Sequence, residues 1–388
     1  MMGRASMSEQ TFAELKQLNE TQGPAATIDR LIATLRSDKQ YHQLFDALLL
    51  KKKHELGLSL AKPTSLDDVP EEKRDEVEAA YVEAAREVGE LLLADNQIAH
   101  AWMYLRTIRE PKKIVEALDA LATDGPAPEE LIDIAFFQGI SPITGLKMLL
   151  KSHGTCSTIT SLDQQFGQMS PEIRMNCARV MVQEMYDNLR ETIQLEVQRK
   201  QAMTPPGQSL RELIAGREWL FADENYHVDV SHLSSVVRFA RALDTTCKEL
   251  DLALQLSQYG THLSPRYQYA GNAPFEDFYP AHIQYFKALL GDGREAAIAY
   301  FREKMGDDAA DPESQLSAFA LFDLLTRLGK NDEALDLACT RLKDSAEEFG
   351  ISLPELCVKA GRYDQLLKLA DEKQDLVTYA AALVGSKG

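Results

Sequence analysis

Apolar residues recur at intervals of three and four along most of the chain, which is the spacing that places them on one side of an α-helix. The clearest segments with this spacing are residues 25–37, 41–56, 70–94, 171–203 and 231–256. No segment alternates apolar and polar residues convincingly over the length of a β-strand. The pattern therefore predicts an all-α fold.

Proline and glycine residues separate the predicted helices. Pro205, Pro206 and Gly207 follow the longest of them, and such a cluster ends a helix and opens a loop. We therefore predict an irregular N-terminal helical array over residues 11–204 and a second array over residues 208–388. The long helix over residues 171–203 is expected to brace the two arrays. Residues 1–10 are expected to form a disordered leader.

The C-terminal third of the sequence contains a repeated turn. Leu290-Gly291 is followed by Glu295-Ala296, and Leu328-Gly329 is followed in the same way by Glu333-Ala334. A weaker copy contains Gly361, so the three turn glycines are 38 and 32 residues apart. These distances bracket the 34-residue period of helix–turn–helix repeats. A left-handed glycine suits the end of the first helix, and a small alanine allows the second helix to approach closely.

The segment over residues 318–342 resembles the tetratricopeptide (TPR) family. Leu321, Gly329 and Ala334 stand where that family has its leucine, turn glycine and first packing alanine. Phe322 and Arg341 depart from the pattern, because the family has small residues at those two positions, and the terminal proline is absent. The resemblance implies an α-solenoid of stacked helical hairpins, TPR-like in its C-terminal part, with a concave surface that binds other proteins.

The charge of the chain narrows the choice of partners. The 388 residues include 42 Lys and Arg against 60 Asp and Glu, for a formal net charge of −18. Such a field repels nucleic acid and anionic membrane surfaces and favours protein partners with basic or mixed segments. No apolar run is long enough to span a bilayer. The five cysteines are scattered without a C-x-x-C pair, which indicates a reducing compartment, so we expect a cytoplasmic protein.

One short segment contains residue types that bind transition metals. His227, Asp229 and His232 provide two imidazoles and a carboxylate, the donor set of many zinc and non-haem iron enzymes. The alternative, which we favour, is that Asp229 and Ser231 cap the helix that follows while the two histidines pack or face water.

A long aromatic loop is the second candidate for chemistry. Its possible ligand- or partner-binding residues are Tyr267, Tyr269, Phe275, Glu276, Phe278 and His282. Long irregular loops between helices are often functional, so this loop is a candidate small-molecule site. Equally, its aromatic side chains can fill the space between the middle helices and the first repeat.

The sequence lacks phosphate-binding, dinucleotide-binding, nucleophile-elbow and EF-hand motifs. We therefore expect a cytoplasmic protein–protein interaction or scaffold protein that needs no cofactor, and the sequence favours a non-enzymatic role without deciding it. The alternatives are a divalent-metal-dependent enzyme centred on residues 227–232 and a small-molecule binder using residues 266–282. The sequence leaves the identity of the partner and the oligomeric state open.

Overall fold

The computed structural model of the chain describes residues 2–121, 125–201, 207–343 and 345–386. These residues form helices and connecting loops without a β-strand, and their one β-feature is an isolated bridge between Ala270 and Asp277. The prediction of an all-α fold is therefore confirmed. Across the same residues, no helix has both the length and the apolar character needed to cross a membrane.

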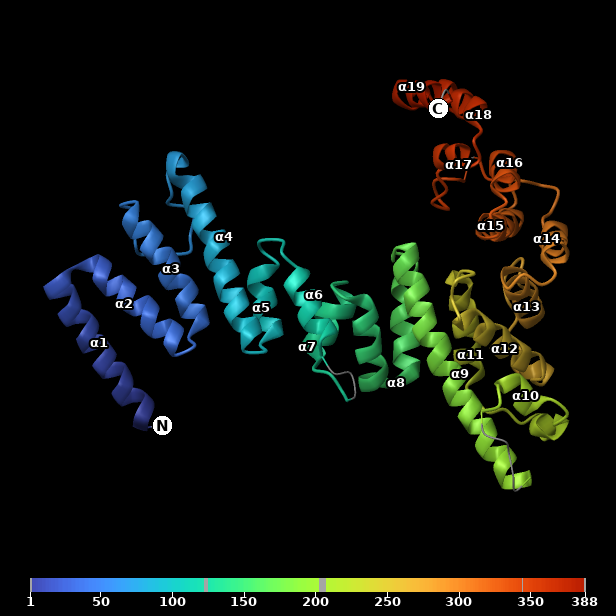
Figure 1. The fold of residues 1–388 in the computed structure, drawn as a ribbon, viewed down its shortest axis with the longest axis horizontal. Coiled ribbons are helices and arrows are strands. Elements are labelled where there is room, and N and C mark those ends of the chain that lie inside the picture. Colours follow the sequence, from blue (N-terminus) through green and yellow to red (C-terminus); the bar gives the residue numbers. More distant parts are fainter. Residues whose placement is uncertain (1, 122–124, 202–206, 344, 387–388) are drawn as a thin grey trace. The chain divides into compact units, whose positions relative to one another are not determined.

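The helices divide into two compact units, residues 1–154 and 155–388 (Figure 1). This division differs from the predicted boundary at Pro205, Pro206 and Gly207, of which the two prolines lie outside the described residues. The long helix α9 (Pro171–Gln201) belongs wholly to the second unit, because its apolar side is covered by the three α-helices that follow it in the chain.

The helices of the first unit are α1 (Met2–Gln22), α2 (Pro24–Ser37), α3 (Tyr41–Glu55), α4 (Glu71–Ala94), α5 (Ile98–Leu105), α6 (Lys112–Asp119), α7 (Glu129–Ile132), the π-helix η1 (Asp133–Phe137) and the first part of α8 (Pro142–Phe166). From α1 to α6, each helix of the first unit contacts the next one in the chain, and α7 contacts α5. Helix α8 is kinked at Gly154, whose φ of 75° is a left-handed conformation. The sequence predicts a disordered leader over residues 1–10, whereas in the structure helix α1 begins at Met2.

The second unit begins with α9 and the shorter helices packed on it. These are α10 (Leu210–Ile214), the 3-10 helix η2 (Glu218–Glu224), α11 (Val230–Phe239), the 3-10 helix η3 (Ala240–Ala242), α12 (Glu249–Thr261) and the 3-10 helix η4 (Pro265–Tyr267). From α12 onward, each α-helix contacts the next one in the chain. They are α13 (Phe278–Leu289), α14 (Arg294–Glu303), α15 (Pro312–Arg327), α16 (Asn331–Arg341), α17 (Leu353–Lys359), α18 (Tyr363–Glu372) and α19 (Leu376–Gly385).

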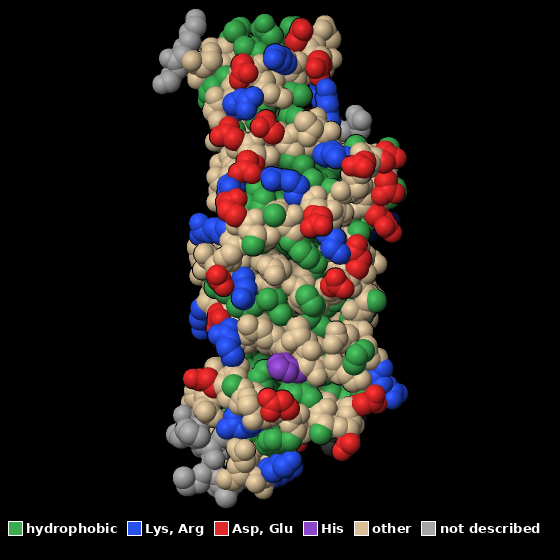
Figure 2. Space-filling model, turned by 90° about the vertical axis from the view of Figure 1, so that its right-hand side faces the viewer, with side chains coloured by type: hydrophobic (Ala, Val, Ile, Leu, Met, Phe, Trp, Pro, Cys, Tyr) green, Lys and Arg blue, Asp and Glu red, His purple; other side chains and the backbone are tan. Residues whose placement is uncertain are grey.

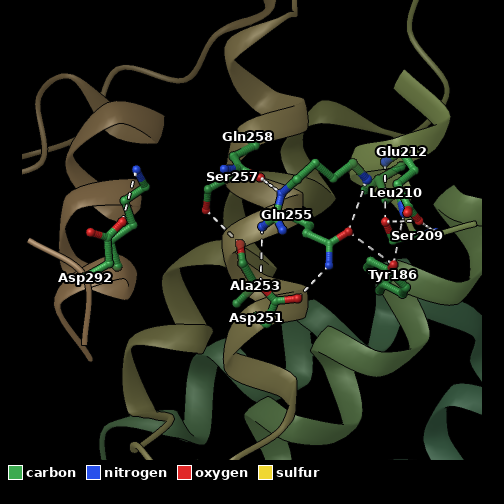
Figure 3. Close-up of polar contacts among 12 residues, drawn as sticks. Tyr186, Ser209, Leu210, Glu212, Asp251, Ala253, Gln255, Ser257, Gln258 and Asp292 are labelled. Carbon is green, nitrogen blue, oxygen red and sulfur yellow. Dashed lines mark hydrogen bonds and ion pairs between the residues drawn. The ribbon is translucent and has the colours of Figure 1, made fainter. Parts of the chain in front are cut away.

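A polar network holds α10 between α9 and α12 (Figure 3). The buried Tyr186 hydroxyl donates to Gln255 Oε1 over 3.3 Å and accepts from the main-chain N–H of Leu210 over 3.0 Å. Gln255 Oε1 also accepts from the main-chain N–H of Arg211 at 3.1 Å, while its amide donates to Asp251. The first N–H groups of α10 have no partner within their own helix, so these side chains satisfy them in the core.

The prediction of one helix over residues 231–256 is wrong. Helix α11 ends at Phe239 and α12 begins at Glu249, with a turn between them. Asp244 Oδ1 accepts hydrogen bonds from the main-chain N–H of Thr246 at 2.8 Å and from its hydroxyl at 2.6 Å. Such a local bond replaces the helical hydrogen bond, and a helical pattern of apolar residues does not reveal it.

The predicted glycine turns are present between the C-terminal helices. Gly291, Gly329 and Gly361 have φ angles of 95°, 74° and 68°, so each ends its helix in the left-handed conformation. Ala334 is fully buried, as the pattern predicts. In the preceding copy, however, Ala296 is exposed and the neighbouring Ala297 is fully buried.

The close approach of α12 and α13 depends on Gly260. A Cβ atom at this position would lie 2.3 Å from the ring of Tyr279, which is 1% exposed and has no room to move. We expect Gly260→Ala to destabilise the second unit by about 1–3 kcal/mol, the usual cost of overpacking. Urea unfolding followed by circular dichroism measures the shift. Gly167→Ala is the matched control, since nothing lies within 4 Å of a Cβ there; equal shifts for both variants would contradict this packing.

Candidate functional site

The structure uses Asp229 to start a helix. This carboxylate is the N-cap of α11 and accepts from the main-chain N–H groups of Ser231 at 2.9 Å and of His232 at 3.2 Å. The Ser231 hydroxyl also donates to it, and that bond lowers the pKa of Asp229. The sequence predicts that Ser231 shares the capping role. In the structure, its hydroxyl instead donates a hydrogen bond to Asp229, which caps the helix.

The imidazole of His227 faces away from that cap. Its side chain is 2% exposed and lies between α9 and α12, with Nε2 3.0 Å from Glu196 Oε2 and Nδ1 3.0 Å from the Tyr259 hydroxyl. The main-chain N–H of His227 donates to the same hydroxyl. The Tyr259 hydroxyl can therefore donate its hydrogen bond to Nδ1, and the Nε2–H group donates to Glu196. These bonds fix the loop before α11 against two helices.

The three predicted metal-binding residues are therefore not brought together around one point. Asp229 and His232 meet only through a main-chain bond, and His227 has other partners. Within the described ranges, no group of three or more His, Cys, Asp and Glu residues is placed to hold a metal ion.

Three of the six candidate residues of the aromatic loop are buried in the second unit. Phe275, Phe278 and His282 are 4%, 4% and 1% exposed, and the Phe275 and Phe278 rings lie 4.5 and 4.3 Å from that of His282. Phe275 also contacts Phe301 of α14. These side chains fill the space between α13 and its neighbours. This packing agrees with the alternative prediction that the aromatic side chains of the loop fill space between helices.

The remaining loop residues lie at the surface. Tyr269 is 51% exposed and contacts the edge of Phe278, while Tyr267 packs against Tyr226. Glu276 pairs with Lys304 at 3.2 Å. The loop therefore divides into a buried aromatic part and a small exposed tyrosine surface.

Inside this aromatic core, His282 is held neutral. Its Nδ1 bonds the carbonyl oxygen of Phe278 at 2.7 Å, and its Nε2 has no hydrogen-bond partner. Burial and, to a smaller extent, the positive charge of Arg241 together lower the pKa of His282 to about 3. The guanidinium of Arg241 stacks on Phe275, 4.7 Å from the ring centre.

A surface groove in the first unit combines apolar and acidic side chains. We call it the α5–α7 groove, and its volume is about 500 Å³. Its lining residues are Ala99, His100, Trp102, Met103, Arg106, Glu129, Glu130, Asp133, Ile134 and Gln138. Met103 is 50% exposed although it is a large apolar residue. Three carboxylates against one guanidinium give the groove a negative balance.

Hydrogen bonds hold the two sides of the α5–α7 groove in place. The indole N–H of Trp102 donates to Gln138 Oε1 at 2.7 Å, and the Gln138 amide donates to Asp133 at 2.7 Å. Glu129 lies 2.9 Å from His153 Nε2. Asp133 begins the π-helix η1, and single π-turns of this kind are frequent at functional sites.

The α5–α7 groove is not predicted by the sequence. Its carboxylates follow Pro128 and look like the acidic start of a helix, and Met103 fits an ordinary helical face. Only the packing of α5 beside α7 brings these residues together. The one available signal was the spacing of His100, Met103 and Arg106, of which the first two lie on one side of α5 and the third directly follows its end.

We expect Asp229→Ala to destabilise the second unit by about 1 kcal/mol, because the helix loses its N-cap. Chemical unfolding of the purified chain measures the change. His232→Ala serves as the control and is expected to stay within about 0.5 kcal/mol of the parent. If the His232 variant were the more damaged one, the capping role of Asp229 would be wrong.

Burial lowers the pKa of His227, and Glu196 opposes that effect. The folded chain therefore gives up this proton more readily than the unfolded chain, so stability is lost as pH falls below about 6.5. We expect Glu196→Gln to lower the pKa of His227 further, as seen by NMR titration of the imidazole signals. A rise would show that the carboxylate does not act on this ring.

Comparison of the chain with protein-family models, with curated proteins and with solved structures finds no match. The resemblance of residues 318–342 to the tetratricopeptide family therefore stays a prediction.

Proposed function

We propose that the chain is a cytoplasmic interaction or scaffold protein of the α-solenoid, helical-repeat type. In support of this, the α-helices from α1 to α6 and from α12 to α19 contact their neighbours in chain order, and the glycine turns recur between the C-terminal helices. In such a stack each helical pair covers one side of the next and leaves another side for partners. The five cysteines are free thiols, which suits a reducing compartment.

The observation that carries the proposal is the α5–α7 groove. Exposed methionine is common at surfaces that bind helices, because its flexible side chain adapts to different partners. Met103 lies in this groove, and Glu129, Glu130 and Asp133 lie beside it. We infer a partner segment with an apolar face for Met103 and with Lys or Arg for the carboxylates.

Charge over the whole chain favours the same class of partner. The net charge of −18 attracts basic segments over distances of about a Debye length, ~8 Å at physiological salt. Acidic and basic side chains are nevertheless interspersed on the face shown in Figure 2. The α5–α7 groove adds the apolar contact that a simple electrostatic attraction lacks.

We expect that a photo-crosslinking amino acid at position 103 captures a protein partner in native lysate through a segment that contains Lys or Arg. Glu129→Gln, Glu130→Gln and Asp133→Asn together should reduce the capture on the order of tenfold, because three exposed ion pairs contribute about 0.2–1 kcal/mol each. Mass spectrometry of the crosslinked peptide identifies the contact.

The matched control neutralises three exposed carboxylates on α4 in the variant Glu72→Gln, Asp75→Asn, Glu78→Gln. It changes the net charge by the same amount and should leave the capture unchanged. Equal losses in both variants would mean that only overall charge matters. A crosslinked segment without basic residues would contradict the inferred partner chemistry.

A further inference from the structure

Helix α19 presents an apolar surface to water. Its sequence, LVTYAAALVG, contains no charged residue. The side chains of Leu376, Val377 and Val384 are 83%, 81% and 76% exposed. With the exposed Ala380 and Ala381 they form one continuous side of the helix, which we call the α19 stripe. Figure 2 shows hydrophobic side chains at the end of the face where Figure 1 places α18 and α19.

The opposite side of α19 fixes the helix firmly to α18. Ala382 is fully buried there, and a Cβ atom on Gly385 would lie 2.6 Å from the ring of Tyr363. Asp375 caps the helix start by accepting from the main-chain N–H groups of Val377 and Thr378. The α19 stripe therefore belongs to a well-anchored helix whose more apolar side is exposed to water. In the usual amphipathic arrangement that side is buried.

The stripe has the symmetry that self-association requires. In an antiparallel pair with Ala380 facing its own copy, Leu376 meets Val384 of the second copy. Alanine at the centre lets the two helices approach to the short end of the usual 8–10 Å. A two-fold interface needs such a self-complementary surface. We propose that the α19 stripe binds the α19 stripe of a second copy of this chain.

Charge argues for a second copy over the basic partner proposed for the α5–α7 groove. The stripe offers no carboxylate to hold a Lys or Arg, so it selects an equally uncharged surface. One ten-residue helix is about 15 Å long and provides less than the roughly 800 Å² per partner of a stable interface. The dimer is therefore weak and reversible, with a dissociation constant in the micromolar range or above.

The dependence on salt separates this dimer from the partner-binding function. Two chains of net charge −18 repel each other, and salt screens that repulsion. Raising NaCl from 50 to 500 mM therefore strengthens the dimer severalfold, while it weakens the capture of a basic partner at the α5–α7 groove. Either result can fail without the other.

Sedimentation velocity of the full chain, from about 1 to 200 µM, tests the proposal. Leu376→Glu should weaken self-association at least tenfold, and so should Val384→Lys. Mixing these two variants should restore a dimer, because the new carboxylate then faces the new ammonium group and the other Leu376–Val384 pair is intact. Val358→Glu on α17 is the matched control, since Val358 is 50% exposed and lies outside the stripe.

Disulfide crosslinking tests the register even if the charged variants fold poorly. In a Cys156→Ser background, which removes the exposed thiol, Ala380→Cys should form a covalent dimer on mild oxidation, whereas Ala296→Cys on α14 should not. A parent chain that stays monomeric at 200 µM in 500 mM NaCl would overturn the proposal. So would crosslinking at Ala380 that is no faster than at Ala296, which would indicate that another segment or protein covers the stripe.

Discussion

Most of the described helices have an apolar side that has to be covered, and the neighbouring helix in the chain usually covers it. This constraint explains the order of contacts from α1 to α6 and from α12 to α19. It also explains the turns, since a helix that folds back on its predecessor must stop abruptly, and left-handed glycines such as Gly329 allow that.

Most residues that the sequence offers as catalytic or metal-binding candidates instead stabilise the contacts between helices and loops. Asp229 satisfies the first N–H groups of α11, and His227 joins a loop to α9 and α12. His282 lies among phenylalanine rings, where burial keeps it neutral. A buried polar group that lacks a hydrogen-bond partner costs free energy. Folding by itself therefore requires such residues.

The surfaces left for function are those that neighbour contacts do not cover. In the first unit, α5 and α7 leave a groove where Met103 lies beside three carboxylates. In the second unit, α19 leaves an uncharged apolar stripe. The two surfaces differ in charge, and we infer that they select different partners: a basic segment for the groove and a second copy of the chain for the stripe.

The sequence by itself determined the local features of this protein. The spacing of apolar residues was enough for the all-α class, and glycine at positions 291, 329 and 361 was enough for the turns, because both depend on contacts within one or two helices. Tertiary structure alone decided the division near Gly154 and the partnership of His227 with Glu196. These features depend on which distant helices pack together, and a residue pattern that fits one helical side does not specify the surface that will cover it.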